Sequence, residues 1–283
     1  MARIGIVLAG GMSKGLYEVG CLQAIAKYFP KDDIKYISGT SIGVPTAYAF
    51  SSGKLDDVVR LWREIDVKQA GKFFPSFAGN ANLLQKVGGL IGESDEMSCK
   101  MFGTVWNFTE RKIEYIPFHK LSSSDRLDYM YASIAFPIFN KGVKINNCTM
   151  LDAAFIDDIP VYPLLEKNLD YIFCIYFEQK YYKFENDAFD RKVIKICHFP
   201  NKKMLDTLTF NPKLIDDMIK YGYDYTSSVI EKIFISDKKE EVYKAIKKVE
   251  AENESRAEPR LTADFVLLNI DKMTSRYVKR HMK

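Results

Sequence analysis

The segment from Ile4 to Leu8 is an uninterrupted apolar run that ends in a glycine turn. A short apolar run closed by glycines is typical of a parallel strand covered by helices on both faces. Directly after the turn, apolar side chains recur at helical spacing over residues 16–28. A chain that begins with a buried strand, a tight turn and a helix is expected to build its core around a central sheet.

The same pattern appears a second time. An apolar run at 34–37 leads into Ser38–Gly43 and then into a helical segment near Val44, where Pro45 is tolerated in the first turn. Another helix is expected over 56–65. This alternation predicts an α/β fold, a three-layer sandwich with a central, mostly parallel β-sheet.

The remaining segments give weaker patterns. We expect a single domain over residues 1–283, with a motif-bearing core at about 4–200 and a C-terminal α/β elaboration at about 201–283. Residues 71–103 lack a clear period and are predicted to form a loop or mobile cap, in which Phe73, Phe74 and Phe77 are candidates for lipid contact or for the core. The other expected elements are a hairpin over 104–109 and 113–118, a helix at 126–135, strands at 171–177, 193–199 and 265–270, and a charged helix at 238–258.

Composition excludes several classes of protein. The formal net charge of +4 is too small to indicate nucleic-acid binding, and five widely spaced cysteines do not form a disulfide framework or a zinc motif. The first residues lack an apolar signal core, and no run approaches the length of a membrane span. We therefore expect a cytoplasmic protein whose contact with a membrane, if it has one, is peripheral; its oligomeric state is left open.

Gly39-Thr-Ser-Ile-Gly43 matches the G-x-S-x-G pattern of a nucleophile elbow. Glycines on both sides allow a sharp strand-to-helix turn that presents the serine hydroxyl. The amino end of the next helix would then direct free N–H groups at the space where a negative oxygen develops. The pattern alone also fits an ordinary turn with a capping serine.

A serine nucleophile needs a base. Ser41, Asp152 and His198 occur in the order of an α/β-hydrolase triad, but that fold places several strands before its elbow. The other histidines are weaker candidates, because His281 lies in a basic tail and His119 follows an apparent strand end.

A partly buried carboxylate can replace histidine when desolvation shifts its pKa toward neutrality. Asp152 follows a short apolar run and precedes two alanines, which let the backbone crowd a catalytic centre. Asp157 and Asp158 are expected to serve as turn or capping residues before Pro160, although either could be the base instead.

Three blocks resemble the patatin-like phospholipase family, in its order and at about its spacing. Leu8–Tyr17 is similar to the family's glycine-rich oxyanion turn, Gly39–Gly43 to its elbow, and Asp152–Pro160 to its aspartate block. Ala132–Pro137 is similar to the segment before that aspartate, and the resemblance covers about residues 4–165.

The resemblance implies hydrolysis of acyl esters of phospholipids or other lipids, with no metal or organic cofactor. Ser41 would form an acyl-enzyme and Asp152 would take its proton. The oxyanion turn would comprise Gly10, Gly11, Met12, Lys14 and Gly15, with backbone amides near Gly10, Gly11 and Met12 holding the negative oxygen.

Two positions depart from the family pattern. Met12 replaces the third glycine of the turn and Ala153 replaces the glycine after the aspartate. Each adds a Cβ where the backbone often takes unusual angles. These changes motivate an alternative interpretation, a lipid-binding or regulatory homologue with little turnover.

Overall fold

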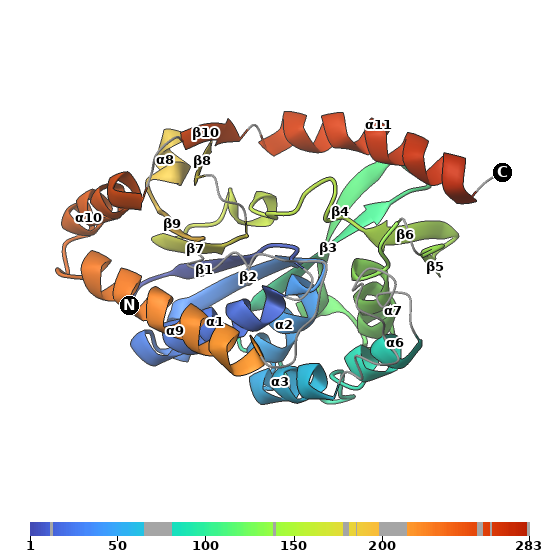
Figure 1. The fold of residues 1–283 in the computed structure, drawn as a ribbon, viewed down its shortest axis with the longest axis horizontal. Helices are drawn as coiled ribbons and strands as arrows, with labels where there is room; N and C mark the ends of the chain where they lie inside the picture. Colours follow the sequence, from blue (N-terminus) through green and yellow to red (C-terminus); the bar gives the residue numbers. More distant parts are fainter. Residues whose placement is uncertain are drawn as a thin grey trace.

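The computed structural model describes residues 1–11, 14–64, 81–137, 140–177, 181–184, 186–197, 214–253, 257–260 and 262–281. Figure 1 shows a central sheet with helices on both faces: α1, α2, α3 and α9 lie below it, and α8 and α11 lie above it. Within the described segments, no helix is long and apolar enough to cross a membrane.

The centre of the sheet is parallel, as predicted. The strand order is β5-β6-β3-β2-β1-β7-β9, and the run from β3 to β9 is parallel throughout. All five residues of β1 are buried, which explains its uninterrupted apolar sequence. The parallel strands are β1 (Ile4–Leu8), β2 (Ile34–Thr40), β3 (Lys100–Asn107), β7 (Tyr171–Ile175) and β9 (Val193–Ile196).

One edge of the sheet is antiparallel. The predicted hairpin forms between β3 and β4 (Lys112–Pro117), and β5 (Val143–Ile145) pairs with β6 (Cys148–Asp152). β6 also pairs with the last three residues of β3. Because β4 pairs with one edge of β3, β2 and β6 both pair with its opposite edge. β2 pairs with the first part of β3 and β6 with the last part.

The helices of the first half lie close to their predicted positions. The structure also contains helices that the sequence patterns did not predict or assigned to another type of element. The predicted helices are confirmed as α1 (Gly15–Tyr28), α2 (Gly43–Ser51), α3 (Leu55–Arg63), α7 (Ser123–Ser133) and α10 (Lys239–Asn253). The further elements are α6 (Ala81–Gly88), α8 (Asp187–Asp190), α9 (Ile215–Ile233), α11 (Thr262–His281), a two-stranded sheet of β8 (Tyr181–Phe184) and β10 (Ala257–Arg260), and the short 3-10 turns η2 (Lys31–Asp33), η3 (Phe118–Lys120) and η4 (Tyr162–Leu164).

Two predictions from the sequence were wrong. The expected strand at 265–270 lies inside α11, because a short apolar run does not distinguish a strand from a helix. Part of the expected loop at 71–103 forms α6 and the start of β3. The three phenylalanines proposed there, Phe73, Phe74 and Phe77, lie outside the described residues.

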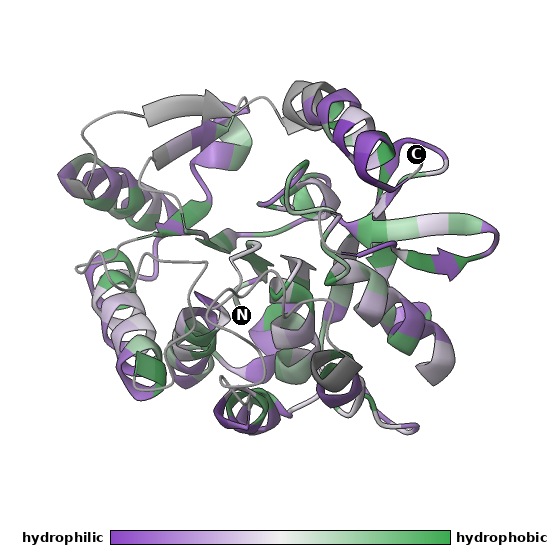
Figure 2. Cartoon of the chain, turned by 45° about the vertical axis from the view of Figure 1, so that its right-hand side comes forward, coloured by the Kyte–Doolittle hydropathy of each residue, from purple (hydrophilic) through white to green (hydrophobic). Residues whose placement is uncertain are grey.

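The core has two parts. The main cluster surrounds β1 and β2, and a second, smaller cluster surrounds Trp106. α11 contributes Ile270, Met273 and Tyr277 to the second cluster, at the spacing of one helical stripe. Figure 2 shows hydrophilic and apolar residues side by side along this C-terminal helix, as expected for an amphipathic helix.

Candidate active site

Ser41 lies on a sharp turn between β2 and α2. Its backbone φ is +54°, in the left-handed region that non-glycine residues rarely occupy. A strained serine between a strand and a helix is the geometry predicted for a nucleophile elbow. The side chain is nearly buried, with 8% of its residue surface exposed.

The two glycines of the elbow permit this turn. A Cβ on Gly39 would lie 2.5 Å from the carbonyl oxygen of Gly43, and a Cβ on Gly43 would lie 2.8 Å from that of Leu8. Both contacts are with backbone atoms that cannot rotate away. The G-x-S-x-G spacing therefore has a steric cause in the packing of the elbow against β1.

Strand register brings Asp152 to the serine. Thr40, the last residue of β2, faces Thr104 of β3, and the next residue of β3, Val105, faces Asp152 at the end of β6. Because β2 and β6 share one edge of β3, their carboxyl ends meet. The residue after Thr40 is Ser41, which is thus placed beside Asp152.

The two side chains are hydrogen-bonded. The Ser41 hydroxyl donates to Oδ2 of Asp152 over 2.6 Å, and the amide of Ala154 donates to Oδ1 over 2.8 Å. Burial raises the pKa of Asp152 to about 7, while the bonds from Ser41 and Ala154 oppose that shift. A buried carboxylate with such a pKa has the proton affinity of a histidine base.

The segment after Asp152 is fixed to the ends of β1 and β2. The hydroxyl of Thr40 donates to the carbonyl of Asp157 over 3.0 Å, and that of Ser38 donates to the carbonyl of Pro160. The carboxylate of Asp157 accepts a hydrogen bond from Tyr115 over 2.7 Å. Asp157 thus helps to hold the segment after Asp152 against β4.

The predicted oxyanion turn is only partly described. The amide of Gly10 donates to the carbonyl of Asp158 over 3.0 Å, so this N–H is already used. The oxyanion role of the amides near Gly10, Gly11 and Met12 stays a prediction, in which Gly10 would first have to release this bond. A Cβ on Gly11 would overlap the ring of Phe177, which explains a glycine there. Met12 lies outside the described residues.

The end of this turn carries a buried cation. Lys14 is 5% exposed, and its ammonium lies 5.4 Å from the centroid of the Phe177 ring. Its backbone amide donates to the carbonyl of Gly11 over 3.0 Å, which closes the turn. Gly15 follows as the first residue of α1, where a Cβ would lie 3.1 Å from Ile42 of the elbow.

The two described histidines lie elsewhere. Nδ1 of His119 donates to the carbonyl of Met101 over 3.1 Å, near the amino end of β3, and burial lowers the pKa of the imidazole. His281 stacks on Tyr277 at the end of α11. His198, the third member of the alternative triad, lies outside the described residues.

The substitution of glycine by Ala153 is accommodated by the structure. Ala153 is not among the described residues with positive φ, and its side chain is buried in the second core cluster beside Leu151 and Ile156. The alanine therefore carries no left-handed strain. Among the described residues, no group of His, Cys, Asp and Glu side chains is placed to hold a metal ion.

Comparison with known proteins places this arrangement in a family. The model of the patatin-like phospholipase family matches residues 6–165, which include the turn, the elbow and the aspartate block. The chain belongs to the patatin-like phospholipase family. Its relatives support a lipid hydrolase at the level of that family.

The curated relatives are much longer proteins. Lysophospholipase NTE1 of Scheffersomyces stipitis is 23% identical over 61% of this chain, and that of Candida albicans is 22% identical over the same share. The matches cover only 11% and 13% of those proteins.

Among solved structures, VipD from Legionella pneumophila matches 98% of this chain and 74% of its own, with a TM-score of 0.51 and 11% identity. This likeness supports the patatin-like α/β fold alone.

Proposed function

We propose that this patatin-like chain hydrolyses acyl esters of phospholipids or related lipids through a Ser41–Asp152 dyad. The observation that carries the proposal is the 2.6 Å hydrogen bond between the serine hydroxyl and the aspartate carboxylate. A buried nucleophile that is bonded to a base of matched pKa is the arrangement that acyl transfer requires.

Catalysis would proceed in two halves. Asp152 takes the hydroxyl proton as Ser41 attacks the ester carbonyl, and the collapsing tetrahedral intermediate expels the alcohol, which receives that proton. Asp152 then takes a proton from water, whose oxygen attacks the acyl-enzyme. Collapse of the second intermediate releases the fatty acid and returns the proton to Ser41.

The developing oxyanion needs hydrogen-bond donors. With the Gly10 amide engaged, we assign this role to the amide of Gly11 and to the turn that follows it, close to the amino end of α1. The buried ammonium of Lys14 adds positive potential to this turn.

The surroundings of the dyad suit an acyl chain. Phe155, three residues after the proposed base, is 39% exposed and packs on Phe136 with their ring centroids 4.6 Å apart. The exposed ring of Phe155, supported by the buried ring of Phe136, offers apolar contact to a lipid tail.

The test is hydrolysis by purified protein across phosphatidylcholine, lysophosphatidylcholine and a short-chain ester, compared with Ser41→Ala. We expect release of fatty acid from at least one lipid, and a loss of about 10³-fold or more in the variant. Undiminished turnover in a folded Ser41→Ala protein would refute the assignment.

The engaged amide of Gly10 and the presence of Met12 favour one second candidate, a lipid-binding homologue with little turnover. A fluorophosphonate probe separates the two functions, because it forms a covalent bond only with an activated serine. An active enzyme is labelled at Ser41, whereas a binding homologue stays unlabelled.

A further inference from the structure

A groove of about 540 Å³ lies between the carboxyl-terminal half of α11 and the two antiparallel hairpins. Its charged lining is basic: Arg111 comes from the β3–β4 turn, Lys141 from the segment before β5, and Lys144 from β5 itself. His281 of α11 also lines the groove. Three threonines also line it, and no acidic residue does. Such a surface attracts anions.

A second hollow, of about 440 Å³, lies on the other flank of α11, and Tyr277 lines both hollows. Arg276, Lys279 and Arg280 line this hollow, again without an acidic side chain. We call the two hollows together the α11 basic surface. Over 269–281 the chain carries four Lys or Arg residues against one Asp, so much of its net positive charge gathers here.

Several of these cations lack an acidic partner. Among the described residues, no carboxylate lies within ion-pair distance of Lys144, Arg276 or Lys279, and all three are exposed. In contrast, Lys54 and Lys195 elsewhere in the fold form ion pairs. Unpaired, solvated cations can bind an external anion without first breaking an internal bond.

The α11 basic surface lies at the same end of the sheet as the dyad. Phe108 lines the groove and is three residues beyond Val105, which faces Asp152. At about 3.3 Å per residue, that separation is roughly 10 Å along the strand. The second hollow includes Pro137, the neighbour of Phe136, which packs on the exposed Phe155.

Exposed apolar side chains flank the cations. Val278 on α11 is 41% exposed, and Phe155 beside the dyad is 39% exposed. Cations interspersed with exposed apolar groups are the composition that binds the interface of an anionic membrane.

α11 is held rigidly to the segment that carries the proposed base. Met273 and Tyr277 pack in the second core cluster with Leu151 and Ala153, the neighbours of Asp152. The hydroxyl of Tyr277 donates to the carbonyl of Lys141 over 2.7 Å. A surface bound through α11 would therefore keep a fixed orientation relative to the dyad.

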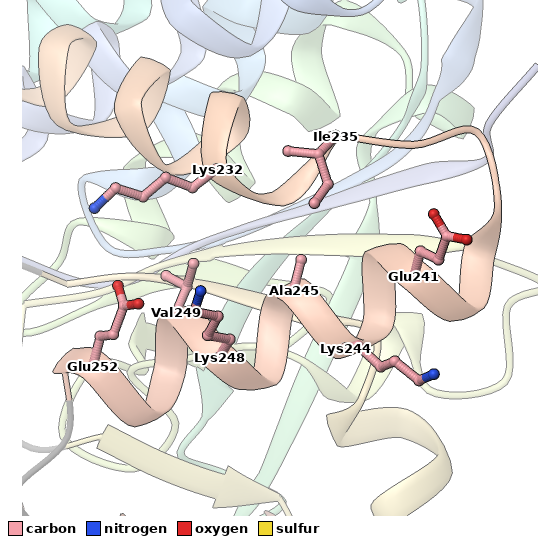
Figure 3. A pocket seen from close by; sticks show the side chains of 8 residues that line it. All are labelled: Lys232, Ile235, Glu241, Lys244, Ala245, Lys248, Val249 and Glu252. Carbon is pink, nitrogen blue, oxygen red and sulfur yellow. The ribbon is translucent and has the colours of Figure 1, made fainter.

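Another large groove among the described residues has a different character. It lies between α9 and α10 with a volume of about 560 Å³, and Figure 3 shows that both Lys232, Lys244 and Lys248 and the acidic Glu241 and Glu252 line it. Acidic side chains would oppose an anionic surface there. This groove provides a matched control of similar size and mixed charge.

We propose that the α11 basic surface docks the protein on an anionic lipid bilayer and turns the dyad toward it. The proposal adds a partner to the proposed lipid hydrolase, and the binding measured below does not require hydrolysis. Each cation near such a membrane strengthens partitioning by roughly fivefold, so three together contribute roughly a hundredfold.

The test is co-sedimentation with vesicles of phosphatidylcholine, with and without about a third of phosphatidylserine. Every protein carries Ser41→Ala, so that lipid is not consumed. We expect the parent to bind the anionic vesicles alone. The triple variant that combines Lys144→Gln, Arg276→Gln and Lys279→Gln should bind them with an affinity lower by roughly a hundredfold. The matched control combines Lys232→Gln, Lys244→Gln and Lys248→Gln at the groove between α9 and α10, so it removes the same charge, and it should bind as the parent does.

Three results would overturn the proposal: equal binding to neutral vesicles, equal losses in the two triple variants, or binding to heparin but to neither vesicle. Thermal melts of both variants report their folding. With Ser41 restored, hydrolysis of a dispersed short-chain ester should be unchanged by the α11 substitutions. Failure of vesicle binding is thereby distinguished from failure of the hydrolase assignment.

Discussion

At the scale of single residues, the proposed Ser41–Asp152 dyad depends on two unfavourable features. Ser41 takes a left-handed backbone angle, and Asp152 holds a carboxyl group away from water. Strain and desolvation of this kind are maintained by the surrounding packing and are common at functional sites. The glycines at 39 and 43 and the bonds to the 152–160 loop supply that packing.

The raised pKa of Asp152 predicts the pH dependence of the reaction. The carboxyl must be deprotonated to accept the serine proton, so kcat/KM on a soluble ester should rise with pH through a single limb centred at about 7. The ordinary pKa of an aspartate side chain is about 3.9, so the difference between this value and the midpoint of the limb reports the desolvation of Asp152. A limb centred near 4 would show that Asp152 is solvated or that another group is the base.

Glu18 predicts a second pH effect, on stability. It is fully buried in α1, and burial raises its pKa well above the ordinary value, with the Thr46 hydroxyl acting in the opposite direction. The folded state therefore retains a proton that the unfolded state releases above about pH 4.3. The free energy of unfolding should fall as pH rises from there toward the folded-state pKa.

Glu18→Gln keeps the shape and removes the titration. Urea unfolding at about pH 5 and about pH 8 should show a smaller loss of stability in the variant than in the parent. The two proteins share Asp152, so its contribution cancels in the comparison. Identical pH dependence would mean that Glu18 does not titrate between these values in either state.

The sequence predicted that Ser41 and Asp152 lie within hydrogen-bond reach, because motifs mark single residues. Ser41 and Asp152 stand in local patterns, and their pairing follows from the order of the family's blocks. The engaged amide of Gly10 and the bond from Tyr115 to Asp157 could not be foreseen. Each joins segments far apart in the chain, and their meeting depends on strand register, which local spacing does not define.

At the scale of elements, α9 shows how closely the later helices join the core. A Cβ on Gly222 of α9 would overlap the carbonyl of Tyr17 in α1, and a Cβ on Gly20 of α1 would overlap that of Ile219 in α9. The two backbones touch at these glycines, which permits a close crossing. The sequence patterns did not predict α9. Its contact with α1 joins segments far apart in the chain, and local patterns contain no information on such a contact.

Gly222→Ala should destabilise the protein by about 1–3 kcal/mol through overpacking. This sign is opposite to that of helix propensity, which favours alanine by about 1 kcal/mol. Ser228→Ala on the exposed side of the same helix is the control and should be nearly neutral. Chemical denaturation measures both, and a stabilised Gly222→Ala variant would contradict the close packing of α1 and α9.

The misassigned segment at 265–270 illustrates a limit of periodicity. Six residues that begin with Phe265 and end with Ile270 fit either a strand or a helix. The deciding contacts are those of Ile270, Met273 and Tyr277 with the Trp106 cluster, and these lie mostly beyond the apolar run. Tertiary packing, which the run does not contain, selects the helix.

At the scale of the whole molecule, the domain boundary remains a prediction. We proposed one domain over residues 1–283, and the packing of α9 on α1 and of α11 on the second core cluster supports it. The protein should unfold in one transition, with coincident curves by circular dichroism and tryptophan fluorescence. Two separated transitions would divide the chain near residue 200.

The central claim is that Ser41 and Asp152 act as one catalytic unit. The most direct measurement is kcat on a soluble ester for Ser41→Ala, Asp152→Asn and the double variant, with His198→Ala as the control. Asparagine keeps the shape of the aspartate but cannot take the proton. We expect each single change to cost about 10³-fold or more, the double variant to be no worse, and His198→Ala to retain most activity. Near-normal kcat in Asp152→Asn, with Ser41→Ala inactive, would contradict the dyad and assign the base to another residue.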